Sequence, residues 1–440
     1  MTVQRLDPGS PDSSGYGHDG ISAPVSNAKL LHHKRLVLVW ALMVLLPLAL
    51  VRLSLFHVYP ERMGGDRNLS AELQQMIQSV NLSALPSHRS GGCDLLQGEW
   101  IPDEVGPTYS NETCNHIQGH QNCLKNGRPD NGYMFWRWKP DDCELPRFNT
   151  TLFIELMRGK LMAFVGDSIA RNHMQALLCT LSQAMIEKPI KTYTDEGDRH
   201  VRWWFPSNNF TVSTFWSPYL AFQTDDESHG IEKGHSKLFL DKLDPVWLAN
   251  ITQFDVLILS SGQWFFKNNL FFQNNTLIGC HHCPGFNITN LGFYFAYREI
   301  LKHVLVELPK LQGFKGLAIL RSFSPDHFED GRWDNGGSCK RTVPFHPNRT
   351  IPTDSLTFEM HRIQREVYDC LERPDRVAMV DVTQISYLRP DGHPGPYRNF
   401  QPFSKEFVGH VQNDCLHWCI PGPVDTWNDM VLETMRQRLI

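Results

Sequence analysis

The sequence predicts an α/β domain in which helices cover both faces of a largely parallel β-sheet, a three-layer α/β/α arrangement. Beyond residue 151, short apolar runs bounded by Gly, Ser, Asp or Pro alternate with helical patterns, as they do in domains of this class. A chain of 440 residues, 41% of them hydrophobic, can bury a sizeable core. The formal net charge of -5 and the lack of a long basic run argue against nucleic acid as the main partner.

The N-terminal part predicts a membrane anchor. Residues 1–35 mix Pro, Gly, Ser and Asp without periodicity, which favours a disordered cytosolic tail. The apolar run of residues 36–58 follows the basic residues His32 to Arg35, which predicts a single transmembrane signal-anchor with the C-terminus in the lumen. A buried core helix is the alternative. A cleaved signal peptide is disfavoured, because some 35 polar residues precede the run.

The residues that follow suit an oxidising lumen. Residues 59–91 are polar and predict a stem. All 11 cysteines lie beyond the apolar run, which predicts several disulfides of undetermined connectivity and at least one unpaired thiol. Acceptor sites for N-glycosylation also occur on this side alone. They are Asn68, Asn81, Asn111, Asn149, Asn209, Asn250, Asn274, Asn287 and Asn348.

We expect one luminal catalytic domain over residues 92–440. Its first part, residues 92–150, is rich in Cys and Trp and predicts a loop-dominated segment held by disulfides. The α/β core follows over residues 151–440. Its predicted buried parallel strands are 161–165, 256–259, 317–320 and 377–382. Its predicted helices are 171–187, 295–308 and 355–371.

One candidate catalytic residue is Ser168, in the sequence Gly166-Asp167-Ser168 between an apolar strand and a helix. In such a turn the hydroxyl lies at the carboxyl edge of the sheet, where backbone N–H groups of the helix start favour an oxyanion. Helical spacing places Arg171 and Asn172 on the same face as Ser168. Alternatively, Ser168 or Asp167 only caps the helix.

The second candidate feature is Asp414 and His417, three residues apart between two cysteines. A serine hydroxyl needs a base to take its proton, and an imidazole needs an acceptor that fixes its tautomer. Asp414 and His417 can supply both functions. They can equally be a turn cap and a buried histidine, so the argument depends on the combination with Ser168.

This combination resembles the Ser-Gly-Asn-His hydrolases and acyltransferases, also called SGNH or GDSL proteins. Further motifs are similar to those of the plant trichome-birefringence-like polysaccharide O-acetyltransferases, over residues 92–440. The sequences of these motifs are most similar to those of the xyloglucan O-acetyltransferase branch. The motifs are Cys93-Asp94, Gly98-Glu99-Trp100, Asn126 to Asp130, Trp136 to Pro140, Val165 to Ser168, Arg321 to Phe328, Gly336 to Cys339, Asp414 to Cys419, Pro421-Gly422 and Asp425 to Asn428.

The resemblance implies a Golgi type II membrane protein that transfers acetyl groups to hydroxyls of a hemicellulose. Ser168 would be the acetyl-accepting nucleophile, His417 the base and Asp414 its orienting carboxylate. The acceptor polysaccharide and the acetyl donor are the implied partners, and no cofactor or metal is implied. The donor and the modified sugar stay open.

The oxyanion hole departs from the broader superfamily, because Trp264 stands where an Asn is expected. The Ser168 N–H is the first candidate donor. The second donor is left open between Gly262, Gln263 and Asn172.

Other residues have a functional and a structural interpretation. Arg171, Trp136, Trp138 and His393 are candidates for substrate binding, although tryptophans more often fill cores. The sequence Cys280-His281-His282-Cys283 suggests zinc, but four consecutive ligands do not readily surround one tetrahedral ion. A local disulfide or separate bridges are the alternatives.

Three functions therefore remain in consideration. The first is an O-acetyltransferase acting on xyloglucan side chains, or on xylan, mannan or pectin. The second is an acetylesterase that uses the same residues with water as the acceptor. The third is a non-catalytic binder of wall polysaccharide, which the retention of Ser168, Asp414 and His417 disfavours.

Overall fold

The computed structural model describes residues 94–184, 188–224, 235–285, 287–372 and 375–440. They belong to one compact unit, residues 91–440. The predicted tail, anchor and stem lie outside the described residues, as do Asn68 and Asn81. Within the described ranges, no helix has the length and apolar character needed to cross a membrane.

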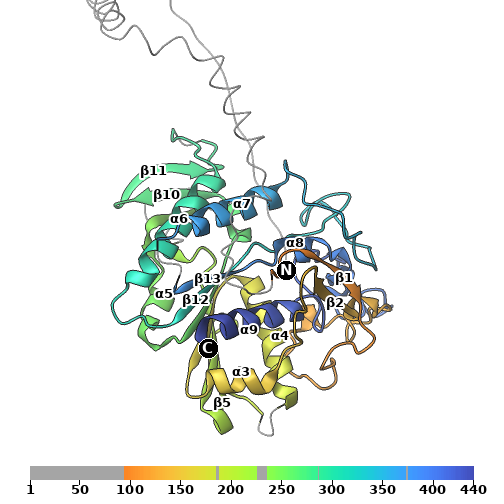
Figure 1. The fold of residues 1–440 in the computed structure, drawn as a ribbon. Coiled ribbons are helices and arrows are strands. Elements are labelled where there is room, and N and C mark those ends of the chain that lie inside the picture. Colours follow the sequence, from red (N-terminus) through yellow and green to blue (C-terminus); the bar gives the residue numbers. More distant parts are fainter. Residues whose placement is uncertain (1–93, 185–187, 225–234, 286, 373–374) are drawn as a thin grey trace, which may run out of the picture. The chain divides into compact units, whose positions relative to one another are not determined.

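A seven-stranded sheet forms the centre of the fold, in the order β13-β12-β9-β3-β6-β5-β4 (Figure 1). The first five strands in this order are parallel, and β5 and β4 extend the sheet with antiparallel pairing. The strands are β3 (Leu161–Gly166), β4 (Ile190–Thr194), β5 (Val201–Phe205), β6 (Phe210–Trp216), β9 (Val256–Ser260), β12 (Leu317–Arg321) and β13 (Val377–Val380).

Helices cover both faces of this sheet, which confirms the predicted α/β/α layers. The long helices are α4 (Ser168–Ala184), α6 (Phe293–Glu307), α7 (Leu356–Asp369) and α9 (Asp425–Leu439). Shorter ones are α3 (Thr150–Met157), α5 (Pro245–Leu248) and α8 (Thr383–Tyr387). Short 3-10 helices are η2 (Gly119–Gln121), η3 (Gly132–Met134), η4 (Pro206–Asn208), η5 (Ile251–Gln253), η6 (Gln263–Phe266), η7 (Leu308–Lys310), η8 (Pro390–Gly392) and η9 (Pro396–Arg398).

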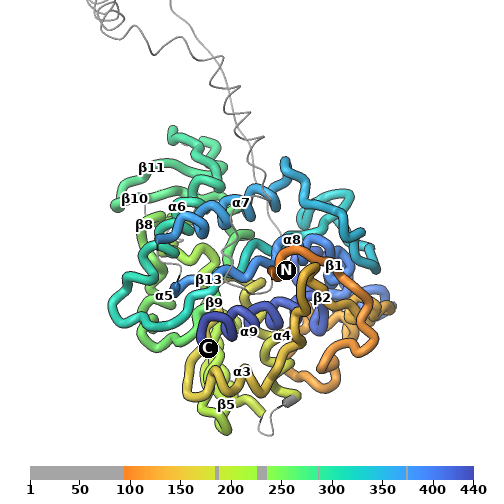
Figure 2. The backbone as a smooth tube through the Cα atoms, in the orientation of Figure 1, coloured from red at the N-terminus to blue at the C-terminus, as the bar shows by residue number. Residues whose placement is uncertain are grey.

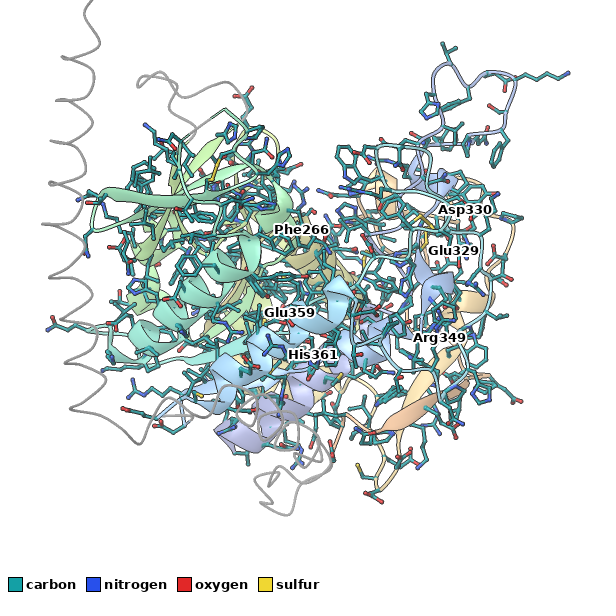
Figure 3. The ribbon with its side chains drawn as sticks, turned by 90° about the horizontal axis from the view of Figure 1, so that it is seen from above. Phe266, Glu329, Asp330, Arg349, Glu359 and His361 are labelled. Carbon is teal, nitrogen blue, oxygen red and sulfur yellow. A yellow bond between two sulfur atoms is a disulfide. The ribbon has the colours of Figure 1, made fainter. Side chains whose placement is uncertain are left out.

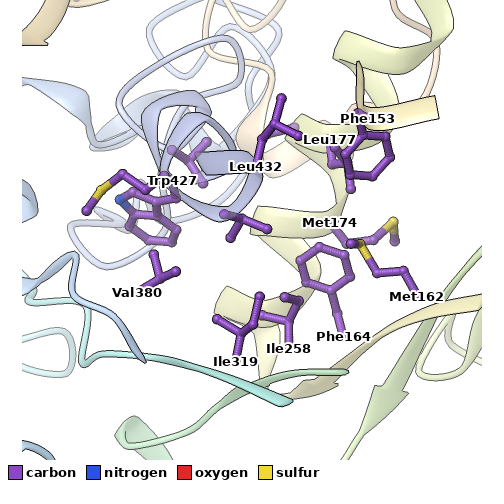
Figure 4. Packing of buried hydrophobic residues seen from close by; sticks show 14 of the residues in the cluster. Phe153, Met162, Phe164, Met174, Leu177, Ile258, Ile319, Val380, Trp427 and Leu432 are labelled. Carbon is purple, nitrogen blue, oxygen red and sulfur yellow. The ribbon is translucent and has the colours of Figure 1, made fainter. Parts of the chain in front are cut away.

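Alternation along the buried strands divides the core in two. Met162 and Phe164 of β3 pack with α3, α4 and α9, as Figure 4 shows for Phe164, Leu177 and Trp427. Ala163 and Val165 point to the other face, where α6 and α7 pack. Because both faces of β3 are buried, its sequence is continuously apolar rather than alternating.

A smaller four-stranded sheet, which the sequence analysis missed, lies beside α6. Its order is β11-β10-β8-β7, with β7 (Ala221–Thr224), β8 (Ser236–Leu243), β10 (Asn269–Gln273) and β11 (Thr276–His281). Strands of mixed composition such as β8 show neither a continuous apolar run nor a clear period-2 alternation. The sequence analysis also missed α9, β5 and β6. It placed the start of α4 three residues late, since Ser168 is itself helical.

The N-terminal segment is loop-dominated as predicted, with one antiparallel pair of strands, β1 (Gly98–Pro102) and β2 (Trp136–Pro140). It lies against the C-terminal third of the chain (Figure 2). The indole N–H of Trp100 donates to the Ile385 carbonyl at 2.8 Å, and the Tyr109 hydroxyl donates to Asp425 at 2.6 Å. The segment is therefore an integral part of the domain.

Three of the disulfides in the described residues join parts of the chain that are far apart in sequence, and a fourth is local. The pairs in the described residues are Cys114–Cys179, Cys123–Cys419, Cys280–Cys283 and Cys339–Cys415. Cys143 is also disulfide-bonded, whereas Cys370 is a free and exposed thiol. Of the two alternatives kept open for Cys280 and Cys283, the local disulfide is confirmed. No group of His, Cys, Asp and Glu in the described ranges is arranged to hold a metal ion.

Candidate active site

The candidate nucleophile lies where β3 passes into α4. Gly166 ends the strand and Ser168 begins the helix, so the half-buried Ser168 side chain lies at the carboxyl edge of the sheet. A Cβ at position 166 would collide with the carbonyl oxygen of Ser260 on the neighbouring strand β9. Glycine therefore lets β9 approach the turn that carries Ser168.

The cap of this helix is Asp167. Its Oδ1 accepts from the Ile169 N–H at 2.9 Å, and its side chain is buried. Burial raises the pKa of Asp167, against the opposing charge of Arg321, which is buried as well. The alternative that Ser168 or Asp167 caps the helix thus holds for Asp167. The Ser168 hydroxyl instead points toward the His417 ring.

Ser168, His417 and Asp414 form one hydrogen-bonded row. The distance from His417 Nε2 to Ser168 Oγ is 2.7 Å, and that from His417 Nδ1 to Asp414 Oδ2 is 2.8 Å. An ionised carboxylate only accepts hydrogen bonds, so Nδ1 carries the imidazole proton and Nε2 accepts from the hydroxyl. The prediction that Ser168 and His417, which are 249 positions apart in the chain, lie within hydrogen-bonding distance is therefore confirmed.

The environment of Asp414 keeps it ionised. Its side chain is 4% exposed, and burial alone would raise its pKa. The hydrogen bonds from the His417 ring and backbone, together with the attraction to that ring when it is protonated, outweigh burial, so the pKa of Asp414 lies well below its usual range. Its Oδ1 also accepts from the backbone N–H groups of Leu416 at 3.1 Å and His417 at 2.9 Å.

The loop that carries His417 is fixed at several points. Disulfides hold it on both sides, from Cys415 to Cys339 and from Cys419 to Cys123. Between them, the amide of Asn172 accepts from the Trp418 N–H at 2.8 Å and donates to the Trp418 carbonyl at 3.3 Å. These contacts hold the imidazole in place relative to Ser168.

Arg128 connects the N-terminal segment to the same region. Its guanidinium pairs with Asp130 and donates to the carbonyls of His393 at 2.9 Å and Asp391 at 2.7 Å. The side chain is 5% exposed. Arg128 belongs to a motif that the sequence analysis used only for the family resemblance, and the structure explains it as a buried brace of the site.

The hydrogen bonds that the candidate oxyanion-hole donors already make distinguish them from one another. Asn172 is fully buried and its amide engages Trp418, so we reassign it from oxyanion donor to a positioning role. The Gln263 amide is half-buried and donates to the Ser324 carbonyl at 3.2 Å. The backbone N–H groups of Ser168 and Gly262 stay predictions for this role.

Burial and contacts also distinguish the candidates for substrate binding. Trp138 is 2% exposed and donates to the Leu95 carbonyl, so the prediction that it binds substrate is wrong. Trp136 packs against the core and is partly exposed. Arg171 is half-buried, donates to the Asp198 carbonyl at 3.2 Å and lies 5.7 Å from the Trp216 ring. For Trp136 and Arg171 the role stays a prediction.

His393 is buried, and the structure does not support contact with a substrate. Its Nδ1 lies 2.8 Å from the His417 carbonyl, its Nε2 lies 2.7 Å from His327, and its ring stacks on Trp418 at 4.2 Å. Burial holds its pKa well below the ordinary value. We therefore reassign His393 to positioning of the His417 loop.

His120 is a residue near the site that the sequence analysis missed. Its ring centroid lies 5.3 Å from that of His417. Burial and the neighbouring His417 lower the pKa of His120 to about 4, so it stays neutral above that pH. No local motif marks it, because only the fold brings the N-terminal segment to His417.

Trp216, the aromatic neighbour of Arg171, packs against Trp264. Trp216 and Trp264 are partly exposed, and their ring centroids are 5.3 Å apart. Lys267 lies 3.3 Å from the Trp264 ring centroid. Trp264 thus has a defined packing role at the position where the broader superfamily carries an asparagine.

An α/β sheet that presents Ser, His and Asp in one hydrogen-bonded row at its carboxyl edge is the arrangement of serine-dependent acyl-transfer enzymes. Comparison with known families agrees. The model of the GDSL/SGNH-like acyl-esterase family found in Pmr5 and Cas1p matches residues 145–434, and that of the PMR5 N-terminal domain matches residues 91–144. The chain belongs to this family, which confirms the resemblance inferred from its motifs.

Among similar proteins is trichome birefringence-like 23 of Arabidopsis thaliana, 46% identical over 378 residues, which cover 84% of this chain and 87% of that protein. The chain is 41% identical over 350 residues to xyloglucan O-acetyltransferase 1 of Arabidopsis thaliana, covering 78% and 80%. It is 37% identical over 431 residues to xyloglucan O-acetyltransferase 1 of Populus trichocarpa, covering 96% of both.

Proposed function

We propose that this protein is an O-acetyltransferase that acetylates hydroxyls of a plant cell-wall hemicellulose, the side chains of xyloglucan in particular. The observation that carries the proposal is the row Ser168–His417–Asp414 in a chain that is similar to two xyloglucan O-acetyltransferases. Xylan, mannan and pectin are the alternative acceptors.

The first half-reaction acetylates Ser168. His417 Nε2 takes the hydroxyl proton while Ser168 Oγ attacks the carbonyl carbon of the acetyl donor. Asp414 stabilises the imidazolium that forms. The oxyanion develops at the start of α4, where the Ser168 N–H is the first donor. Collapse of the tetrahedral intermediate breaks the bond to the leaving group, which receives the proton from His417.

The second half-reaction transfers the acetyl group to the sugar. His417 takes the proton of the acceptor hydroxyl, whose oxygen attacks the acetyl carbonyl of Ser168. The ester bond to Ser168 breaks, and His417 returns the proton to Ser168 Oγ. A bound sugar hydroxyl outcompetes water through its effective concentration, so acceptor binding decides between a transferase and an esterase.

We also propose a single-pass type II Golgi protein with its catalytic domain in the lumen. Residues 36–58 would be the anchor, and the asparagines of the Asn-x-Ser/Thr sites would carry glycans. All seven of these asparagines in the described ranges are exposed or partly exposed, which leaves each accessible to a glycosyltransferase. They are Asn111, Asn149, Asn209, Asn250, Asn274, Asn287 and Asn348. Glycosidase digestion of the purified protein, followed by mass analysis, tests this.

The test of function uses the full chain purified in mild detergent, a panel of acetyl donors, and xyloglucan, xylan, mannan and pectin oligosaccharides. Mass spectrometry of the sugar should show the gain of acetyl on xyloglucan fragments, and Ser168→Ala should abolish it. Release of acetate without a mass gain on any sugar would assign an esterase instead. Sugar binding without turnover would assign a non-catalytic binder.

A further inference from the structure

The loop of residues 396–413 starts and ends beside the candidate active site. Gly395 and Asp414 pair across its base, with both N–H to carbonyl hydrogen bonds formed at 2.8 and 2.9 Å. Asp414 is the carboxylate of the row, so this base is anchored to His417. Beyond the single 3-10 turn η9 the loop contains no helix or strand, and long loops with close ends are frequently functional.

The loop is also braced from the N-terminal segment. Asn126 donates to the Tyr397 carbonyl at 2.7 Å, and the Asn126 carbonyl accepts from the Gln401 N–H at 2.9 Å. On the other side, the Gln412 amide donates to the Trp333 carbonyl at 3.4 Å. The loop therefore has a defined position relative to Ser168.

This braced loop exposes large aromatic side chains. Phe400 is 59% exposed and Phe403 is 71% exposed, and Trp333 beside the loop base is 61% exposed. In the described ranges, Phe135 is the one further exposed phenylalanine, at 37%. Rings left in water next to an active site, rather than packed in the core, indicate a surface that a ligand covers.

Polar groups near these rings fit a sugar chain. A pyranose ring has apolar C–H faces, which pack on aromatic rings, and hydroxyl edges, which need hydrogen-bonding partners. The exposed side chains of Gln401 and His410 place such polar groups on the same loop. Its charged side chains are of both signs, Arg398, Lys405 and Glu406. This mixture suits a neutral polysaccharide better than a polyanionic one, which needs a cluster of cations.

We propose that Phe400, Phe403 and Trp333 form an acceptor-binding surface for the sugar rings of a neutral polysaccharide, away from the hydroxyl that is acetylated. Figure 3 labels Glu329 and Asp330, which start the segment that carries Trp333. The surface holds the polymer so that one hydroxyl at a time reaches His417. This inference rests on the proposed function and adds to it where the acceptor chain binds.

The test measures binding separately from turnover. In a Ser168→Ala background, the full chain with Phe400→Ala and Phe403→Ala is titrated with a long xyloglucan oligosaccharide by calorimetry. We expect the dissociation constant to rise about tenfold, which corresponds to about 1.4 kcal/mol. The matched control is Leu277→Ala, which removes an apolar side chain 39% exposed on β11. It should bind as the parent does.

In the enzyme with Ser168 intact, the same double substitution should raise the KM for long oligosaccharides more than it lowers kcat. The effect on short acceptors should be smaller, because they do not reach the loop. Thermal unfolding verifies that each variant is folded. If the wild type transfers no acetyl group but the double substitution still weakens oligosaccharide binding, the proposed transferase function is wrong and the proposed binding surface is supported.

Unchanged affinity and unchanged KM in a folded double variant would overturn the inference. Equal losses of affinity for xyloglucan and for a polygalacturonate oligosaccharide would contradict the preference for a neutral chain.

Discussion

Replacing Asp414 with Asn is the sharpest test of how the hydrogen bonds between Asp414, His417 and Ser168 are directed. The carboxylate accepts the Nδ1 proton of His417 at 2.8 Å and leaves Nε2 free to accept from Ser168. An amide nitrogen at the same place would donate to Nδ1, and the ring proton would move to Nε2. The base would then carry a proton on the atom that has to accept one.

The expected size of the effect is large. Loss of the correct tautomer lowers kcat by about 10⁴-fold in the Ser-His-Asp template, or about 5.4 kcal/mol of transition-state stabilisation. The Asp414 backbone contacts are partly kept, because an amide oxygen can still accept from the His417 and Leu416 N–H groups. We therefore expect a folded protein with almost no acetyl transfer.

The structure contains a matched control for this substitution. Asp381 is also buried and lies 2.7 Å from a histidine, His361, which Figure 3 labels on α7. Asp381→Asn disturbs the same kind of pair outside the candidate site, so it should alter stability and leave transfer by the folded protein within about threefold. Transfer by folded Asp414→Asn within about tenfold of the wild type would refute the tautomer argument.

Three further predictions concern stability. Gly166→Ala would drive a Cβ into the Ser260 carbonyl, so we expect a lower melting temperature and loss of activity, measured by calorimetry and the transfer assay. Replacing Cys123 and Cys419 by Ser should cost on the order of 2–5 kcal/mol in urea unfolding, while activity falls because the His417 loop loses an anchor; equal stability would contradict this. Burial raises the pKa of Asp425 to about 6, so this group favours the folded state at low pH and the contribution is lost as pH rises from about 4 to 6. The difference in unfolding free energy between the wild type and Asp425→Asn should shift in favour of the variant across that window, and a flat difference would show that Asp425 titrates normally.

The sequence was sufficient for the parallel centre of the fold. Strands such as β3 and β9 are buried on both faces, so they are continuous apolar runs with clear boundaries. The strands of the antiparallel extension and of the four-stranded sheet are mixed in composition, and β5 carries polar and aromatic residues together. β4, β5 and β6 pair in chain order, but the place of β6 beside β3 and of β8 beside β10 depends on segments farther apart in the chain, which no local pattern records.

The candidate site divides in the same way. Ser168, Asp414 and His417 stand in local motifs, so their roles could be hypothesised, and their meeting could be confirmed only by coordinates. His120 and the bracing function of Asn172 depend on tertiary contacts between the N-terminal segment, α4 and the His417 loop. Buried residues such as Trp138 were misjudged, because an indole in a sequence does not reveal whether it faces a ligand or the core.

The central claim is that Ser168 carries the acetyl group between donor and polysaccharide, and the most direct measurement is peptide mass spectrometry of the protein quenched during turnover. The full chain is mixed with an acetyl donor such as acetyl coenzyme A or 4-nitrophenyl acetate, quenched rapidly and digested. We predict one added acetyl group on the peptide that contains Ser168, which disappears when xyloglucan oligosaccharide is added as the acetylated sugar forms. Acetylated sugar that accumulates while Ser168 stays unmodified, or that forms equally well with Ser168→Ala, would contradict the account.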